Sequence, residues 1–162
     1  MKKSTQPIPP GFHTVTPSLI VRNGAEAIEF YKKALGAQEL MRMAGPDGKI
    51  GHAELKIGDS IVFLTDENPA MGCKSPQTLG GTASSLYLYV EDVDKAFQRA
   101  IDAGGKVTMP VADMFWGDRF GNFAQHSHPG LDPAGDRRRS EEILRSDGAA
   151  GAEEIGLVPD SD

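Results

Sequence analysis

The chain of 162 residues contains a single cysteine, Cys73. One cysteine cannot form a disulfide within the chain, which is typical of a protein from a reducing compartment, so we expect a cytoplasmic location. The segment 69–81 around it is rich in Gly, Pro and polar residues. This setting favours an inert loop cysteine over a catalytic thiol.

Long apolar runs and concentrated positive charge are also missing. No apolar stretch follows the basic residues at the start of the chain, so neither a signal peptide nor a membrane span is expected. Lys and Arg number 17 against 23 Asp and Glu, a formal net charge of -6. Phosphate binding needs a concentrated basic face, so nucleic acid is not expected as a partner. A membrane is not expected as a partner either, since no apolar run is present.

The chain does contain an internal repeat. Residues 16–36 align with residues 85–105, so that Leu19 matches Leu88 and Gly36 matches Gly105. The apolar positions of the helical part repeat in the same phase. Each copy predicts a strand, a polar turn, a short helix and a glycine stop. Such a duplication predicts a fold of two similar modules.

The first copy extends into a β-α-β-β-β module at 12–68, after an N-terminal tail at 1–11. Asn23 is a suitable helix cap, Gly36 a suitable helix end, and the sequence Pro-Asp-Gly at 46–48 predicts a hairpin turn. The elements predicted by periodicity are strands at 12–21, 38–44, 49–57 and 60–65 and a helix at 25–35.

After a linker at 69–82, the second module at 83–128 begins with the same pattern. Asp92 is a suitable helix cap. The predicted elements are a strand at 84–90, a helix at 93–103, a strand at 106–112 and one more near 120–126. A fourth strand is not apparent, so this module is predicted to be incomplete.

The segment 129–162 is an atypical tail. The thirty-nine residues after Phe123 contain no aromatic residue and only six Leu, Ile or Val. Pro129 and Pro133 fall where a closing strand is needed, and proline cannot donate a ladder hydrogen bond. The tail is therefore predicted to be mobile or weakly helical, with its best helical pattern at 137–144. Removal of residues 130–162 is expected to cost within about 1 kcal/mol of stability.

Several phrases of the sequence together resemble one protein family. They are VTPSLIV at 15–21, AIEFYKKALG at 27–36, GHAELKIG at 51–58, VEDVDKAF at 90–97 and WGDRFG at 116–121. They resemble the vicinal oxygen chelate superfamily, the glyoxalase, bleomycin-resistance and extradiol-dioxygenase group, and its PhnB-like branch in particular. The resemblance implies an α+β, glyoxalase-like fold in which paired βαβββ modules form a half-barrel sheet. It also implies a homodimer.

Family enzymes hold a divalent metal with side chains from the first and fourth strands of each module. The resemblance puts Thr16, Phe63 and Ser85 at three of these positions and the fourth in the tail. A phenyl ring cannot bind a metal, and unaided hydroxyl groups bind divalent ions weakly. The usual metal site is therefore predicted to be absent, and no cofactor is predicted.

An alternative metal set consists of His13, His52 and Glu54, which would suit one divalent ion such as Zn, Ni, Fe or Mn. His52 and Glu54 are two residues apart on a predicted strand and so share a face. The simpler interpretation is a solvated polar face opposite Ala53 and Leu55.

The predicted pocket has an aromatic character. Tyr87 and Tyr89 alternate onto one face of their strand, which the resemblance puts inside the half-barrel. Asp118 and Arg119 are predicted to form an ion pair that fixes a turn. The predicted pocket residues are Thr16, Ser18, Phe63, Ser85, Tyr87, Tyr89 and Trp116.

These observations favour a pocket for a small organic molecule, as in the drug-sequestering members of the family, without a metal. Whether any reaction is catalysed is left open. One alternative is a metal-dependent glyoxalase-like or dioxygenase-like enzyme. Another is an impaired product of a frame-shifted gene. Under permitted codon choices, 128–133 read one nucleotide later gives Ile-Pro-Gly-Trp-Ile-Leu, which resembles the closing strand that the family carries and this tail lacks. The DNA sequence tests this last hypothesis.

Overall fold

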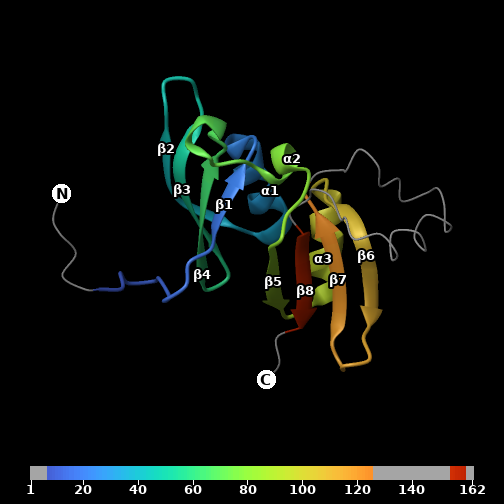
Figure 1. Ribbon diagram of the computed structural model, residues 1–162. Helices are drawn as coiled ribbons and strands as arrows, with labels where there is room; N and C mark the ends of the chain where they lie inside the picture. The colour runs from blue at the N-terminus through green and yellow to red at the C-terminus, as the bar shows by residue number, and fades with distance from the viewer. Residues whose placement is uncertain (1–6, 126–153, 160–162) are drawn as a thin grey trace. The chain divides into compact units, whose positions relative to one another are not determined.

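The computed structural model describes residues 7–125 and 154–159. The chain divides into two compact units, Met1–Ser75 and Pro76–Asp162, called here the first and second unit. Each unit contains a four-stranded mixed sheet and a helix that packs on the sheet (Figure 1). Among the described residues, no helix has both the length and the apolar character to span a membrane.

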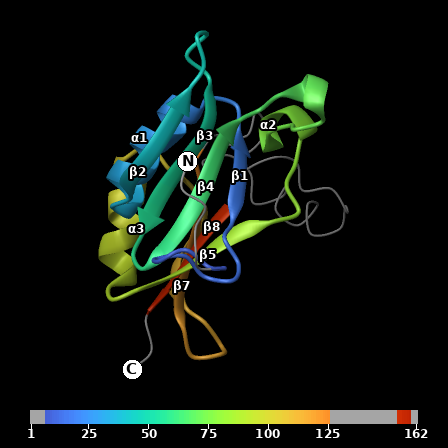
Figure 2. The ribbon, with the colours of Figure 1, turned by 90° about the vertical axis from the view of Figure 1, so that its left-hand side faces the viewer.

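The first unit contains a complete β-α-β-β-β module. The strand order is β1-β4-β3-β2, in which β1 runs parallel to β4 and the other pairs are antiparallel (Figure 2). Helix α1 packs on one face of the sheet, where Tyr31, Leu55 and Leu64 are fully buried. Its elements are β1 (Ser18–Val21), α1 (Gly24–Leu35), β2 (Gln38–Ala44), β3 (Ile50–Ile57) and β4 (Ser60–Asp66).

Local signals in the sequence explain the limits of α1. The side chain of Asn23 accepts a hydrogen bond from the backbone N–H of Glu26 at 3.3 Å, and Gly36 ends the helix with a φ of 67°. That left-handed conformation favours glycine, which has no Cβ to clash. In the second unit, Asp92 caps its helix in the same way. Both predicted caps are confirmed.

The second unit repeats the topology of the first. The strand order is β5-β8-β7-β6, and β5 runs parallel to β8 as β1 does to β4. This repetition confirms the predicted α+β fold of paired βαβββ modules. The elements after β4 are η1 (Pro69–Met71), α2 (Pro76–Leu79), β5 (Ser85–Val90), α3 (Val93–Asp102), β6 (Lys106–Asp113), β7 (Arg119–Ala124) and β8 (Glu154–Pro159).

The closing strand β8 corrects the prediction of an incomplete second module. It pairs with β5 on one side and β7 on the other, and Ile155, Leu157 and Val158 are fully buried. The tail prediction is therefore wrong for 154–159, because this short apolar run finds partners on both of its edges. The expected sites of a strand at 129–134 and of a helix at 137–144 lie outside the described residues.

The first strand is shorter than predicted. It begins at Ser18 rather than at Phe12. Proline has no backbone N–H, so Pro17 cannot donate to a ladder, although its carbonyl accepts the N–H of Phe63 at 2.8 Å. Phe12 instead contacts the ring of Phe63 edge to face, with the ring centroids 5.9 Å apart.

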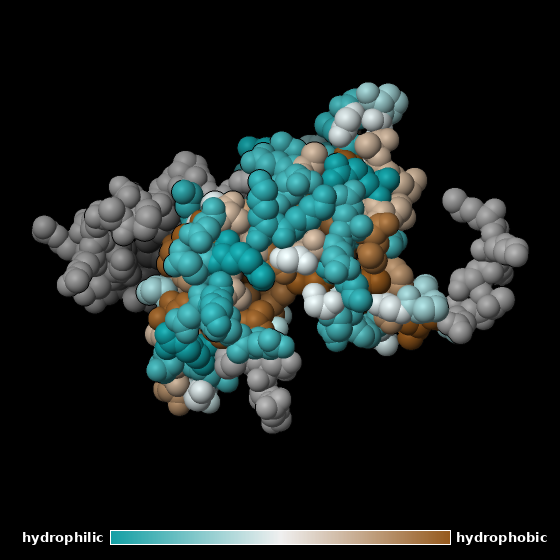
Figure 3. All heavy atoms as spheres, turned by 180° about the vertical axis from the view of Figure 1, so that it is seen from behind, coloured by the Kyte–Doolittle hydropathy of each residue, from teal (hydrophilic) through white to brown (hydrophobic). Residues whose placement is uncertain are grey.

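The outer surface of α1 is charged. Lys32 pairs with Glu29 at 2.9 Å and with Glu39 of β2 at 3.0 Å, and Arg42 also pairs with Glu39 at 2.8 Å. Figure 3, which shows the molecule from behind, is likewise dominated by hydrophilic residues, with hydrophobic ones showing between them. These exposed pairs contribute little stability, because water screens them.

Candidate functional site

The two faces of the second sheet have different roles. On one face, Phe97 of α3 packs edge to face on Phe123 of β7, with the ring centroids 6.1 Å apart. Phe123 is paired with Ile155, and Ile155 with Leu86, so these three residues share the face that α3 covers. Alternation then puts Tyr87 on the opposite face, which α3 does not cover.

Four aromatic side chains gather on that opposite face: Tyr87 and Tyr89 of β5, Phe120 of β7, and Trp116 of the β6–β7 turn. The rings of Tyr87 and Phe120 are stacked, 5.5 Å apart and 16° from parallel. Tyr89 lies 5.7 Å from Tyr87, and Trp116 lies 6.4 Å from Phe120, both edge to face. We call these four residues the aromatic platform.

Strand β8 lies beneath the platform. A Cβ added at Gly156 would come within 2.7 Å of the Phe120 ring and 3.2 Å of the Tyr87 ring. Val158, the register partner of Tyr89, is fully buried. The absence of a side chain at Gly156 is therefore what lets the two stacked rings lie on the sheet.

A tight turn holds Trp116 in place. The backbone N–H of Met114 donates to the carbonyl of Asp118 at 2.7 Å, and that of Gly117 donates to the carbonyl of Met114 at 2.9 Å. The indole N–H of Trp116 donates to Oδ2 of Asp118 at 2.9 Å. Three hydrogen bonds thus fix the turn and orient the indole ring.

The predicted ion pair between Asp118 and Arg119 is wrong. Arg119 instead donates two hydrogen bonds to Asp94 of α3, at 2.6 and 2.7 Å, and one to Asp113 at 2.8 Å. Neighbouring residues at the start of a strand point to opposite faces, so Arg119 turns toward α3 and Asp118 toward the platform. The hydrogen bonds from Arg119 lower the pKa of Asp94, and those acidic partners raise the pKa of Arg119.

The hydroxyl group of Tyr87 is a hydrogen-bond donor at neutral pH. Partial burial raises its pKa above the ordinary value, and the negative charge of Asp118 raises it further, followed by Tyr89. Both effects disfavour a phenolate. The platform therefore combines aromatic faces with the neutral hydroxyl group of Tyr87 and one carboxylate.

The open face of the first sheet carries the predicted alternative metal residues. Nε2 of His52 lies 3.4 Å from Oε1 of Glu54, and the His52 ring packs edge to face on Phe63 at 4.8 Å. His13 is exposed and precedes β1. Among residues 7–125 and 154–159, no three His, Cys, Asp or Glu side chains come together, so His13 does not join His52 and Glu54.

The strand register gives the counterpart of Phe63 in the second unit. Phe63 of β4 pairs with Ser18 of β1, and the internal repeat makes Tyr87 of β5 the counterpart of Ser18. Tyr87 pairs with Gly156 of β8, so Gly156 is the counterpart of Phe63. Glycine offers no side-chain ligand. With Thr16, Phe63 and Ser85 at the other positions, as the resemblance implies, such a set would not fit the family's metal.

The structure brings together part of the predicted pocket. Tyr87, Tyr89 and Trp116 lie on one face of the second sheet, and Ser85 begins the same strand. Phe120 was missed. It lies four residues after the predicted pocket residue Trp116, so strand alternation could have assigned both residues to one face of the sheet. The remaining predicted residues, Thr16, Ser18 and Phe63, belong to the first unit, and their place in one pocket with the platform stays a prediction.

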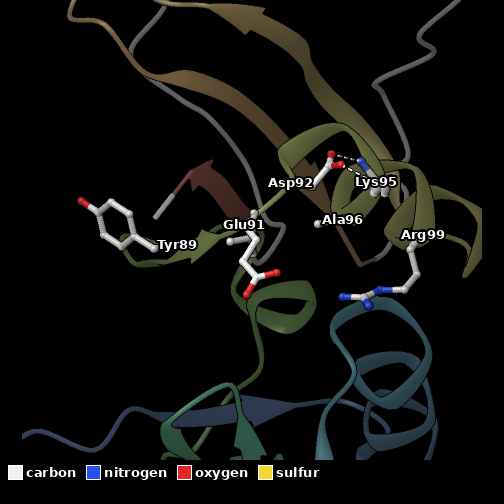
Figure 4. A pocket seen from close by; sticks show the side chains of 7 residues that line it. Tyr89, Glu91, Asp92, Lys95, Ala96 and Arg99 are labelled. Atoms are coloured by element: carbon white, nitrogen blue, oxygen red, sulfur yellow. Dashed lines mark hydrogen bonds and ion pairs between the residues drawn. The ribbon is translucent and has the colours of Figure 1, made fainter. Parts of the chain in front are cut away.

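A second feature of this unit is an open hollow of about 530 Å³ beside the start of α3. Figure 4 shows Asp92 joined to Lys95 there, while the ring of Tyr89 points away from both. Asp92 caps the helix and pairs with Lys95 at 2.8 Å. These polar groups serve the helix end, which leaves the aromatic platform as the better candidate site. The hollow is lined by Tyr89, Val90, Glu91, Asp92, Lys95, Ala96 and Arg99.

The two βαβββ modules define an α+β protein of glyoxalase-like fold. The chain belongs to the Glyoxalase/Bleomycin resistance protein/Dioxygenase superfamily, whose family model matches residues 11–135. The match ends before β8. An uncharacterized protein of Mycobacterium bovis is 49% identical over 110 residues, which cover 66% of this chain and 72% of that protein. One of Mycobacterium tuberculosis has the same identity, with 66% and 65% covered.

Solved structures share the fold. TioX from Micromonospora sp. ML1 superposes with a TM-score of 0.60 at 21% identity, covering 91% of this chain and 98% of TioX. The PhnB protein from Bacillus cereus gives 0.57 at 15%, covering 91% and 100%. The fosfomycin resistance protein FosX from Mesorhizobium loti gives 0.56 at 12%, covering 92% of each chain. At these identities the likeness concerns the fold alone.

Proposed function

We propose that the protein binds a small planar organic molecule on the aromatic platform without the help of a metal. The observation that supports this most directly is the exposure of the platform. Tyr87 is 49% exposed, Tyr89 61% and Trp116 50%, so large aromatic faces meet solvent. A contiguous exposed apolar patch of this kind marks a binding surface more often than a random piece of protein surface. Flat rings offer stacking partners to a flat ligand.

The chemistry of the platform favours binding over catalysis. Its polar groups are two tyrosine hydroxyls, which are weak acids, and a carboxylate that already accepts the indole N–H of Trp116. General acid–base catalysis needs a group whose pKa lies near the working pH, and the raised pKa of Tyr87 moves it further away. Family membership and the resistance function in the name of FosX are compatible with a small-molecule ligand.

Replacing Tyr87 with alanine should weaken the binding of a planar probe such as 4-methylquinoline about tenfold. An aromatic contact contributes about 0.5–1.5 kcal/mol beyond its buried area, and the loss also frees its stacking partner Phe120. Trp116 is the only tryptophan, so its single indole N–H resonance reports binding in an NMR titration.

The matched control for that titration is Leu79→Ala, which removes an exposed apolar side chain from α2 rather than from the platform or the predicted pocket. The control should leave the dissociation constant of 4-methylquinoline unchanged. An indole resonance that does not move with added probe, or equal losses in both variants, would argue against the platform as the binding site.

A metal-dependent enzyme is the second candidate, because His52 and Glu54 lie 3.4 Å apart on one face. Two ligands without a third give weak affinity, so we expect purified protein to carry far less than one Zn, Ni, Fe or Mn per chain. Elemental analysis of the full chain and of His52→Ala tests this. One metal per chain, lost in His52→Ala, would support the enzyme instead.

Homodimer formation and a cytoplasmic location are further proposals, and sedimentation equilibrium and cell fractionation test them. The proposal of a frame-shifted, impaired product is tested by the DNA sequence. Its shifted frame either encodes Ile-Pro-Gly-Trp-Ile-Leu at 128–133 or does not. The platform proposal does not depend on any of these outcomes.

A further inference from the structure

The aromatic platform includes a carboxylate in a fixed position. Asp118 is partly buried, and its Oδ2 accepts the indole N–H of Trp116 at 2.9 Å. An ionised carboxylate has room for about four hydrogen bonds, so this contact orients the group without using all of its acceptor capacity. The turn hydrogen bond from Met114 to the Asp118 carbonyl fixes the backbone as well.

The charge of Asp118 is not neutralised within the described part of the chain. Its sequence neighbour Arg119 is held on the other face of the sheet by Asp94 and Asp113. No ion pair involving Asp118 occurs among residues 7–125 and 154–159. The negative charge of Asp118 interacts with the platform, because it contributes to the raised pKa of Tyr87.

The rings themselves favour the same sign of ligand charge. The face of an aromatic ring carries negative potential and attracts a cation that lies over it. Tyr87, Tyr89 and Trp116 are all about half exposed or more, so their faces are accessible to a ligand. Ring faces and carboxylate therefore act together, and an anionic ligand would be repelled by both.

We propose that Asp118 makes the aromatic platform selective for organic cations over neutral molecules of the same shape. This inference rests on the proposed function, since it requires that the platform bind a planar molecule. It adds the chemical class of the ligand, a flat ring system with a fixed positive charge, and it assigns selectivity to one residue that the predicted pocket did not include.

Two probes of nearly the same size and shape that differ in charge test this proposal on the full chain. N-methylquinolinium and 4-methylquinoline are both two-ring molecules with one methyl group, and only the first is a permanent cation. NMR titrations that follow the Trp116 indole N–H should give a dissociation constant about tenfold lower for the cation. Added salt should reduce this preference, because it screens charge.

The variant Asp118→Asn should remove the preference and leave the binding of 4-methylquinoline within about twofold. The asparagine oxygen can still accept the indole N–H, so the position of Trp116 is retained. Asp113→Asn is the matched control, because it removes one negative charge from the face that carries Arg119. It should keep the tenfold preference.

Each outcome has a defined meaning. Equal binding of the two probes to the unmodified chain, or a preference that survives in Asp118→Asn, overturns the assignment of charge selectivity while the platform still stands as a binding site. Failure of both probes to bind overturns the proposed function and this inference with it. Loss of the preference in Asp113→Asn as well would show a general effect of net charge rather than of Asp118.

Discussion

Removal of residues 154–162 is expected to unfold the second unit. The deletion takes away β8, whose Ile155, Leu157 and Val158 are fully buried, and breaks its pairing with both β5 and β7. Losing even one such side chain to alanine costs about 2–5 kcal/mol. The loss of three, with two rows of backbone hydrogen bonds, approaches the whole stability of a small domain.

Tryptophan fluorescence measures this loss directly, because the only tryptophan, Trp116, lies in the second unit. The truncated chain should show in water the emission that the full chain shows only in concentrated urea. A chain lacking only residues 160–162 is the control and should unfold at the same urea concentration as the full chain. Leu157→Ala should fall between them, about 2–5 kcal/mol less stable than the full chain.

The tail prediction from the sequence led to the opposite expectation, a cost within about 1 kcal/mol for removing 130–162. The expected loss of stability is larger here because β8 is buried. An unfolding midpoint of the truncated chain equal to that of the full chain would restore the earlier expectation and would show that the second sheet holds without β8.

Replacing Asp66 with alanine is expected to destabilise the first unit by about 2–4 kcal/mol. Oδ1 of Asp66 accepts the backbone N–H of Gly24 at 2.7 Å, and Oδ2 accepts that of Ile50 at 2.7 Å. One carboxylate thus ties the start of α1 to the start of β3. A hydrogen bond to a charged group contributes about 1.5–3 kcal/mol, and both donors would lose their partner.

Urea unfolding followed by circular dichroism gives this difference, and hydrogen exchange of the Gly24 amide shows whether the helix start opens first. Asp59→Ala is a suitable control. Asp59 is an exposed acid in the β3–β4 turn that accepts a hydrogen bond from the neighbouring Ser60. It should change stability by no more than about 0.5 kcal/mol. Equal effects of the two substitutions would mean that the Asp66 bridge contributes little.

Local features of the fold were predictable from the sequence, because they depend on residues close together in the chain. Asn23 and Asp92 cap helices with their own side chains, and Gly36 ends one where a left-handed residue is needed. The repeat of 16–36 at 85–105 predicted two modules of one design, and both sheets have that design. The absence of the usual metal site was also predicted from local information, the ligand chemistry of single residues, and it stays a prediction.

Tertiary structure alone decided which residues meet across the sheets. Four apolar or small residues at 155–158 are too few for a periodic signal, and only the open edges of β5 and β7 make them a strand. Residues far apart in sequence likewise pair by register, which put Gly156 beneath the rings of Tyr87 and Phe120. Arg119 pairs with Asp94 rather than with Asp118 for the same reason. A partner 25 residues away in the sequence cannot be identified from the residues next to Arg119.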